Sequence, residues 1–247
     1  MTDFKSVIDA VGQRPAQDAD QNASRHYSER FSKEVALWIR EKVIERKIGT
    51  HVLAPEGKVD TIYGVGNRGK SLDIGVLNSR KYLLLNISIK TFNFKDRKTK
   101  NYRHNYTGRF YELLGEELDL RRSYAHSILA AIIFLPEDSL TDTSPSSFAH
   151  AVHQFSKIAK KNRDETAPRF EFVFIAVHNT EGRLFLFDAT QVPPRVGIPS
   201  IKSIKSINDV LDQLAAIAKN RQAKTEIDAL PTYTAFTYED GNDENEP

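Results

Sequence analysis

Apolar residues recur along this chain at two spacings, which predict helices in some segments and strands in others. Between residues 28 and 47 they follow a helical period, and Gly49 then predicts a stop. Helical patterns also occupy 4–11, 108–120, a segment running from the Ser/Pro cluster at 144–147 to about 160, and 208–218. Extended patterns occupy 59–63, 72–77, 82–89, 127–135, 170–177 and 184–187.

The order of these segments predicts an α/β fold with a mixed central β-sheet flanked by helices. Residues 72–77 and 82–89 are expected to pair around a turn at 78–81, and the strongly apolar 127–135 is typical of a buried central strand. One such domain accounts for residues 27–236. A flexible segment, 1–26, precedes it, and an acidic disordered tail, 237–247, follows it.

Composition narrows the class of protein. A chain of 247 residues with 40% hydrophobic content can fill one sizeable core. The absence of cysteine excludes disulfides, thiolate metal sites and a cysteine nucleophile. No apolar run is long enough to span a membrane, and the first 26 residues lack the apolar stretch of a signal peptide. We therefore expect a soluble cytoplasmic protein.

The formal net charge of +2 conceals an uneven distribution. Residues 239–247 hold five of the 33 acidic residues and no base, so the body of the chain has 28 acids against 35 bases. Residues 90–109 hold seven bases and one acid. Such a local excess favours a polyanionic partner, although a solvated basic loop would have the same composition.

The stretch GVGNRGKS, residues 64–71, matches the pattern of a nucleotide-binding phosphate loop. A phosphate loop needs a helix that begins at its Lys-Ser pair, because the helix N-terminus helps to hold the phosphates. Only residues 72–77 separate this pair from a turn, and they include two β-branched residues and a glycine. A strand fits better, so a P-loop ATPase is the third interpretation of the chain.

Three polar residues on the predicted hairpin form a more specific arrangement. Ser88 and Lys90 are two apart in an extended segment and so point to the same face, while pairing around 78–81 brings Asp73 towards them. A carboxylate can hold Mg²⁺, and a nearby lysine can orient a water or neutralise the transition state of phosphodiester hydrolysis.

Over residues 31–135 this order of elements resembles the PD-(D/E)xK nuclease superfamily, the fold of many type II restriction endonucleases. By that resemblance Asp73 matches the metal-binding aspartate and Lys90 the catalytic lysine, while Ser88 stands where the family usually has Asp or Glu. The resemblance implies a restriction-endonuclease-like core and a Mg²⁺-dependent endonuclease. Its partner would be double-stranded DNA, its role restriction or another defence against foreign DNA, and its assembly a homodimer.

Because serine is a poor Mg²⁺ ligand, the resemblance calls for a carboxylate from a helix, as some members of the superfamily have. Glu34, on the first long helix, is the preferred donor, and Glu112 or Glu116 are the alternatives. If no carboxylate completes the site, the chain is a catalytically inactive nuclease-fold protein that binds DNA.

Each residue of the site also has a purely structural interpretation. Asp73 can pair with Arg68 or Lys70 on the surface, Lys90 can protect a strand edge, Ser88 can be a small sheet residue and Glu34 helix surface. The adjoining stretch supplies side chains suited to phosphates and base edges. The predicted DNA-binding residues are Lys95, Arg97, Lys98, Lys100, Asn101, Arg103, Asn105 and Arg109. Phe92 and Phe94 fit the core better than base stacking.

Overall fold

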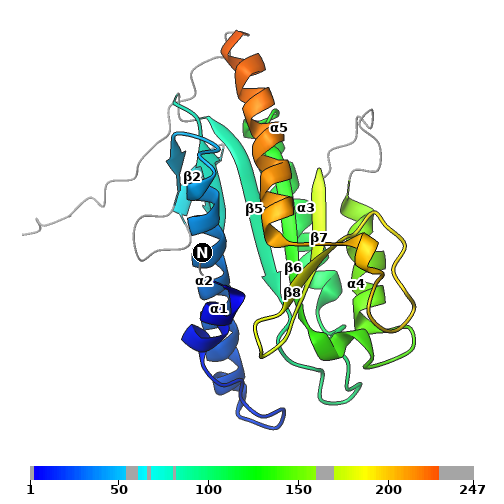
Figure 1. Cartoon of the computed structure of the whole chain (residues 1–247). Coiled ribbons are helices and arrows are strands. Elements are labelled where there is room, and N and C mark those ends of the chain that lie inside the picture. The colour runs from blue at the N-terminus through cyan, green and yellow to red at the C-terminus, as the bar shows by residue number, and fades with distance from the viewer. Residues whose placement is uncertain (1–2, 54–60, 66–67, 80–81, 160–169, 228–247) are drawn as a thin grey trace, which may run out of the picture.

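A mixed β-sheet forms the centre of the computed structural model, which describes residues 3–53, 61–65, 68–79, 82–159 and 170–227. Across these residues the sheet has seven strands in the order β1-β4-β5-β6-β7-β8-β9 (Figure 1). They are His51–Val52, Ile74–Leu77, Leu83–Thr91, Ile128–Pro136, Phe172–His178, Leu184–Asp188 and Ile204–Lys205. The three central strands, β5, β6 and β7, are parallel, and all other neighbours pair antiparallel.

Strand β6 is buried along its whole length, because helices cover both faces of the sheet. Its near-continuous apolar sequence is what a doubly covered parallel strand requires. A separate two-stranded ribbon, β2 (Thr61–Val65) and β3 (Arg68–Leu72), comes before β4 in the chain.

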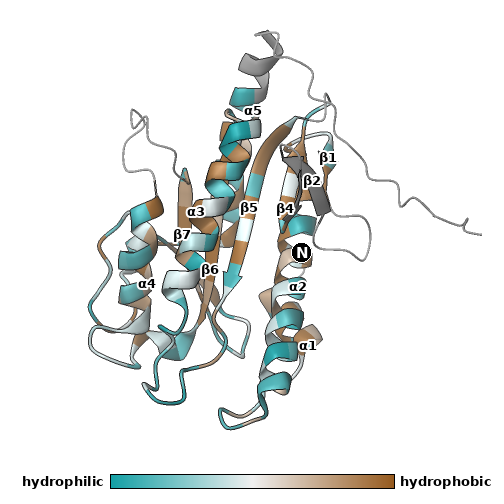
Figure 2. Cartoon of the chain, turned by 180° about the vertical axis from the view of Figure 1, so that it is seen from behind, coloured by the Kyte–Doolittle hydropathy of each residue, from teal (hydrophilic) through white to brown (hydrophobic). Residues whose placement is uncertain are grey.

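The helices form a layer on each side of the sheet (Figure 1). One face is covered by α1 (Phe4–Val11), α2 (Gln21–Glu45) and α5 (Ile207–Ile227), and the other by α3 (Tyr106–Ser123) and α4 (Ser147–Phe155). Alternate residues of β6 enter the two apolar cores on either side, whereas β5 gives Leu85, Ile87 and Ile89 to one of them. Figure 2 shows the hydrophobic strands enclosed between helices with hydrophilic outer faces. Short 3₁₀ turns occupy Glu137–Leu140, Ser156–Ile158 and Ile201–Ser203.

The sequence prediction of a mixed sheet flanked by helices is confirmed, with local differences. The predicted strand 72–77 is interrupted at Asp73, which forms a bend between β3 and β4. Helix α4 ends at Phe155, where a 3₁₀ turn follows, and α5 continues to Ile227. The acidic tail 237–247 lies outside the described residues.

The N-terminal segment differs from the flexible one expected for residues 1–26. Helix α1 has its predicted bounds, and Phe4, Val7 and Val11 are buried in the core. The ring of Phe4 lies 6.2 Å from that of Phe134 on the central strand. An eight-residue helix has little stability alone, so packing holds it in place.

No helix in the described part of the chain combines the length and the apolar character needed to cross a membrane.

Candidate functional site

The bend between β3 and β4 places Asp73 beside strand β5. The residue that follows it, Ile74, pairs with Ile87 of β5. The carboxylate Oδ2 of Asp73 accepts a hydrogen bond of 2.6 Å from the backbone N–H of Ile89. The predicted approach of Asp73 to the Ser88–Lys90 segment is therefore present.

On β5, the side chains of alternate residues turn towards α3 and contact one another. Asn86 Nδ2 donates to Ser88 Oγ (3.0 Å), and Ser88 Oγ donates to Glu116 Oε2 (2.6 Å). Lys90 Nζ donates to the other oxygen of the same carboxylate, Glu116 Oε1, at 2.8 Å. One helix carboxylate thus joins the serine and the lysine.

Both members of the Lys90–Glu116 pair are largely withdrawn from solvent, with side-chain exposures of 11% and 18%. A second carboxylate, that of Glu112 one turn earlier on α3, has its Oε2 3.9 Å from Lys90 Nζ and 2.7 Å from Arg109 Nη1. In a partly dehydrated setting such charge-assisted contacts hold the lysine in a fixed position.

Glu34 does not join this cluster in the described structure. Its helix, α2, packs against the side of β5 that carries Leu85, Ile87 and Ile89, whereas Ser88 reaches α3. Among the described residues, no hydrogen bond or ion pair connects Glu34 with Lys90. The structure therefore brings Glu116, one of the two alternative donors, into contact with Ser88 and Lys90 in place of the preferred Glu34.

Lys70 and Ser71 belong to strand β3, which pairs with β2, and no helix begins at this point. The strand at this position agrees with the prediction from sequence. Residues 66 and 67 of GVGNRGKS lie outside the described residues. The Lys-Ser pair consequently lacks the helix N-terminus that a phosphate loop uses.

Most residues of the predicted DNA-binding segment contact other residues of the same chain. Lys95 pairs with Asp138 (3.0 Å), and Arg97 donates to the backbone carbonyl of Ala19 (2.6 Å). Arg103 reaches the Thr143 hydroxyl (2.6 Å) and the Pro145 carbonyl. Asn101 is largely buried and Arg109 pairs with Glu112, which leaves Lys98, Lys100 and Asn105 as the exposed members with no side-chain partner among the described residues.

The aromatic residues of this segment pack in the core, which is the structural role that the sequence predicted for Phe92. Phe92, Tyr102 and Tyr106 are buried, and the rings of Phe92 and Tyr106 meet edge to face at 4.6 Å. Phe94 is partly buried against Tyr27 of α2 (5.7 Å).

The donor chemistry of the site suits a hard divalent cation. Asp73 and Glu116 supply carboxylate oxygens and Ser88 a hydroxyl, and Mg²⁺ commonly takes one or two carboxylates and completes its shell with water and substrate. Within the described ranges, no three His, Asp or Glu side chains lie close enough together to form a metal cluster. Asp73 and Glu116 are the two carboxylates that such an ion would use.

Sequence reasoning overlooked Asn86, whose side chain is 1% exposed and whose Oδ1 has no hydrogen-bond partner among the described residues. The signal was the period of two that links it to Ser88 and Lys90.

Comparison with protein-family models, with curated proteins and with solved structures finds no match to this chain.

Proposed function

We propose that this protein is a Mg²⁺-dependent endonuclease of restriction-endonuclease type, which cuts double-stranded DNA in restriction or another defence against foreign DNA. The observation that carries the proposal is the shared contact of Glu116 with Ser88 and Lys90, on a strand whose Ile89 N–H donates to the carboxylate of Asp73. Glu116 thereby supplies a carboxylate at the position where Ser88 has none.

Asp73 and Glu116 would hold the cation. Bound Mg²⁺ supplies a Lewis acid for the phosphate and lowers the pKa of a coordinated water. Lys90 presents a fixed positive charge where negative charge develops in the transition state. Its ammonium group has three N–H donors, and the 2.8 Å bond to Glu116 uses one of them, so donors remain for a phosphate oxygen.

Ser88 and Asn86 act as positioning residues. The Ser88 hydroxyl donates to one carboxylate oxygen of Glu116, and Asn86 in turn donates to that hydroxyl. This chain fixes the orientation of a side chain that comes from a different element. Because each chain carries one such site, cutting both strands of a duplex calls for two copies, which supports a homodimer on DNA.

The decisive experiment incubates the purified protein with plasmid and phage DNA in Mg²⁺ or in EDTA. Discrete fragments that form only with Mg²⁺ are expected. A gel shift without cleavage under every condition would instead identify an inactive DNA-binding protein. Turnover of ATP with no effect on DNA would restore the phosphate-loop interpretation.

A further inference from the structure

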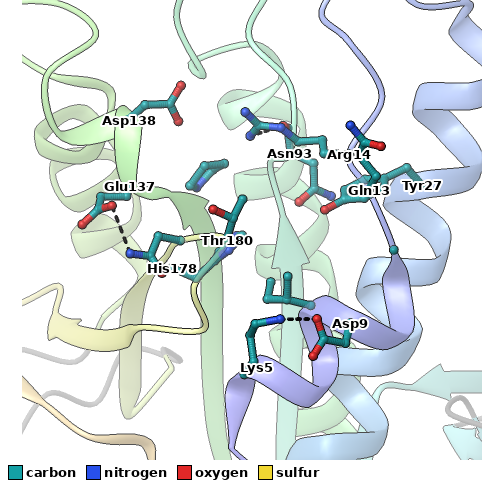
Figure 3. Close-up of a pocket in the computed structure, with 14 residues that line it drawn as sticks. Lys5, Asp9, Gln13, Arg14, Tyr27, Asn93, Glu137, Asp138, His178 and Thr180 are labelled. Atoms are coloured by element: carbon teal, nitrogen blue, oxygen red, sulfur yellow. Dashed lines mark hydrogen bonds and ion pairs between the residues drawn. The ribbon is translucent and has the colours of Figure 1, made fainter.

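A cavity of about 440 Å³ lies at the carboxyl ends of the parallel strands (Figure 3). Its lining includes Pro136 and His178, the last residues of β6 and β7, and Asn93, two residues beyond β5. The end of α1 and residues 12–14 close it from the other side. Open α/β sheets bind ligands in this position, and the volume suits a small organic molecule.

The cavity adjoins the candidate nuclease site but shares no residue with it. Asn93 follows Lys90 by three residues, so their Cα atoms are at most about 10 Å apart. The side chain of Lys90 reaches Glu116 of α3, whereas Ile8 and Tyr27 place the cavity against α1 and α2.

His178 belongs to the cavity lining, and both of its ring nitrogens are covered in the folded chain. Its side chain is almost completely buried, with the ring stacked on Phe31 at 4.8 Å. Neither ring nitrogen has a hydrogen-bond partner among the described residues. Burial, assisted by the charge of Arg14, lowers the pKa of His178 to about 3, so the ring is neutral and offers one N–H and one lone pair.

The charges around the cavity disfavour an anion. Asp9, Glu137 and Asp138 outnumber Lys5 and Arg14, and Lys5 is already paired with Asp9. Within the described part of the chain, the exposed Arg14 makes only long hydrogen bonds, to the Asn93 carbonyl (3.4 Å) and the Tyr102 hydroxyl (3.5 Å). A neutral ligand with both donors and acceptors fits this lining better than a phosphate.

We propose that the cavity binds a nucleobase, an inference that rests on the proposed function. The guanidinium of Arg14 and the amide of Asn93 can pair with a base edge, the imidazole of His178 can do so once its ring turns towards the cavity, and the ring of Tyr27 offers an apolar surface. Enzymes that take a base out of a duplex read it through such edges and flat contacts. The base could come from a free nucleoside or be an extrahelical base of the DNA substrate, and the two tests distinguish these sources.

The first test titrates the four 2′-deoxynucleosides and, separately, inorganic phosphate into the full-length protein by calorimetry. At least one nucleoside is expected to bind and phosphate is not. His178→Phe keeps the ring packing but removes both polar atoms, and it should weaken binding at least tenfold. Arg14→Gln, at an exposed position, gives a second variant whose folding is not in question. Arg195→Gln removes the same charge from an exposed residue outside the cavity and should leave binding unchanged.

The second test places 2-aminopurine at successive positions of a duplex that the protein cuts. Fluorescence should rise several-fold at one position with wild-type protein and fail to rise with Arg14→Gln or His178→Phe. Nucleoside binding without this rise would assign the cavity to a free nucleoside and overturn the extrahelical source. Failure of both tests would overturn the inference. Cleavage of DNA is measured separately. If the protein cuts DNA but fails both tests, the proposed nuclease function stands and the nucleobase inference falls. If it cuts no DNA, the nuclease function falls, and the calorimetry still shows whether the cavity binds a nucleoside.

Discussion

Ser88 carries no charge, yet its hydroxyl contacts a carboxylate because Glu116 extends from the neighbouring helix. At this scale the proposed chemistry depends on three charged groups with separate tasks. Asp73 and Glu116 would supply oxygen ligands, and Lys90 would supply a positive charge. Each task can be removed by one substitution.

Asp73→Ala and Lys90→Ala should each reduce Mg²⁺-dependent cleavage by about 100-fold or more, because they remove a ligand and a transition-state charge. DNA binding should change little, since both act on the reaction. Rates from plasmid nicking and affinities from gel shifts measured in Ca²⁺ separate the two effects. Normal cleavage by Asp73→Ala would show that the site has been assigned to the wrong residues.

Glu116→Gln and Glu34→Gln form a matched pair that identifies the helix carboxylate. We expect Glu116→Gln to raise the Mg²⁺ concentration for half-maximal cleavage by about tenfold or more. Glu34→Gln, on the helix across the sheet, should leave it unchanged. Titration of Mg²⁺ at fixed DNA concentration measures both, and the opposite result would return the role to Glu34. Ser88→Glu adds a carboxylate on the strand, and it should lower the Mg²⁺ concentration for half-maximal cleavage.

At the scale of elements, the loop between β5 and α3 divides into a structural part and an exposed part. Asn93 and Lys95 receive hydrogen bonds from the N-terminal segment through their backbone carbonyls, and Arg103 is held near Pro145. Lys98 and Lys100 lie on the exposed turn between them. Of the predicted DNA-binding residues, these two lysines and Asn105 are therefore the ones available to follow a DNA backbone.

Replacing Lys98 and Lys100 together with glutamine should make DNA binding less sensitive to salt. Each phosphate contact on duplex DNA contributes about 0.9 to the slope of log K against log salt, so the double variant should lose up to about 2 from that slope. Lys202→Gln with Lys219→Gln provides an equal charge change on exposed residues elsewhere. If both double variants keep the wild-type slope, the DNA interface lies on another surface.

The elements themselves were largely predictable, whereas their mutual placement was not. The period of two shows that Ser88 and Lys90 share a face, and the apolar run at 127–135 shows a buried strand. The choice between Glu34 and Glu116 depends on which side of β5 each helix covers, and both helices have an apolar stripe that suits either side. The cavity gave no sequence signal, because Arg14, Asn93 and His178 meet only in the folded chain.

At the scale of the whole molecule, His178 should make the fold sensitive to mild acid. Burial lowers its pKa from 6.5 to about 3, with Arg14 assisting and Asp138 opposing, so the unfolded chain takes up a proton that the folded chain excludes. Its contribution to stability is complete above pH 6.5 and is lost as the pH falls towards 3. Each pH unit in that window removes about 1.4 kcal/mol, or about 2 kcal/mol at pH 5.

His178→Phe should therefore lose less unfolding free energy than wild type between pH 7 and pH 5. Urea unfolding followed by circular dichroism at pH 7, 6 and 5 measures this difference, and His153→Gln, at an exposed histidine, controls for the loss of a titrating ring. Parallel pH profiles for His178→Phe and wild type would mean that His178 gains a proton freely in the folded state.

The burial of α1 has a practical consequence for anyone preparing this protein. Phe4 contacts Trp38, Phe134 and His178, which belong to three different elements, so the first turn of the chain is part of the interior. If residues before the long helix α2 were removed on the assumption that they are flexible, α1 would be lost. The central strand would then lack the aromatic ring of Phe4 that covers it, and one wall of the cavity would be open. Such a shortened protein should aggregate on expression, and its failure to act on DNA would say nothing about the site at Lys90.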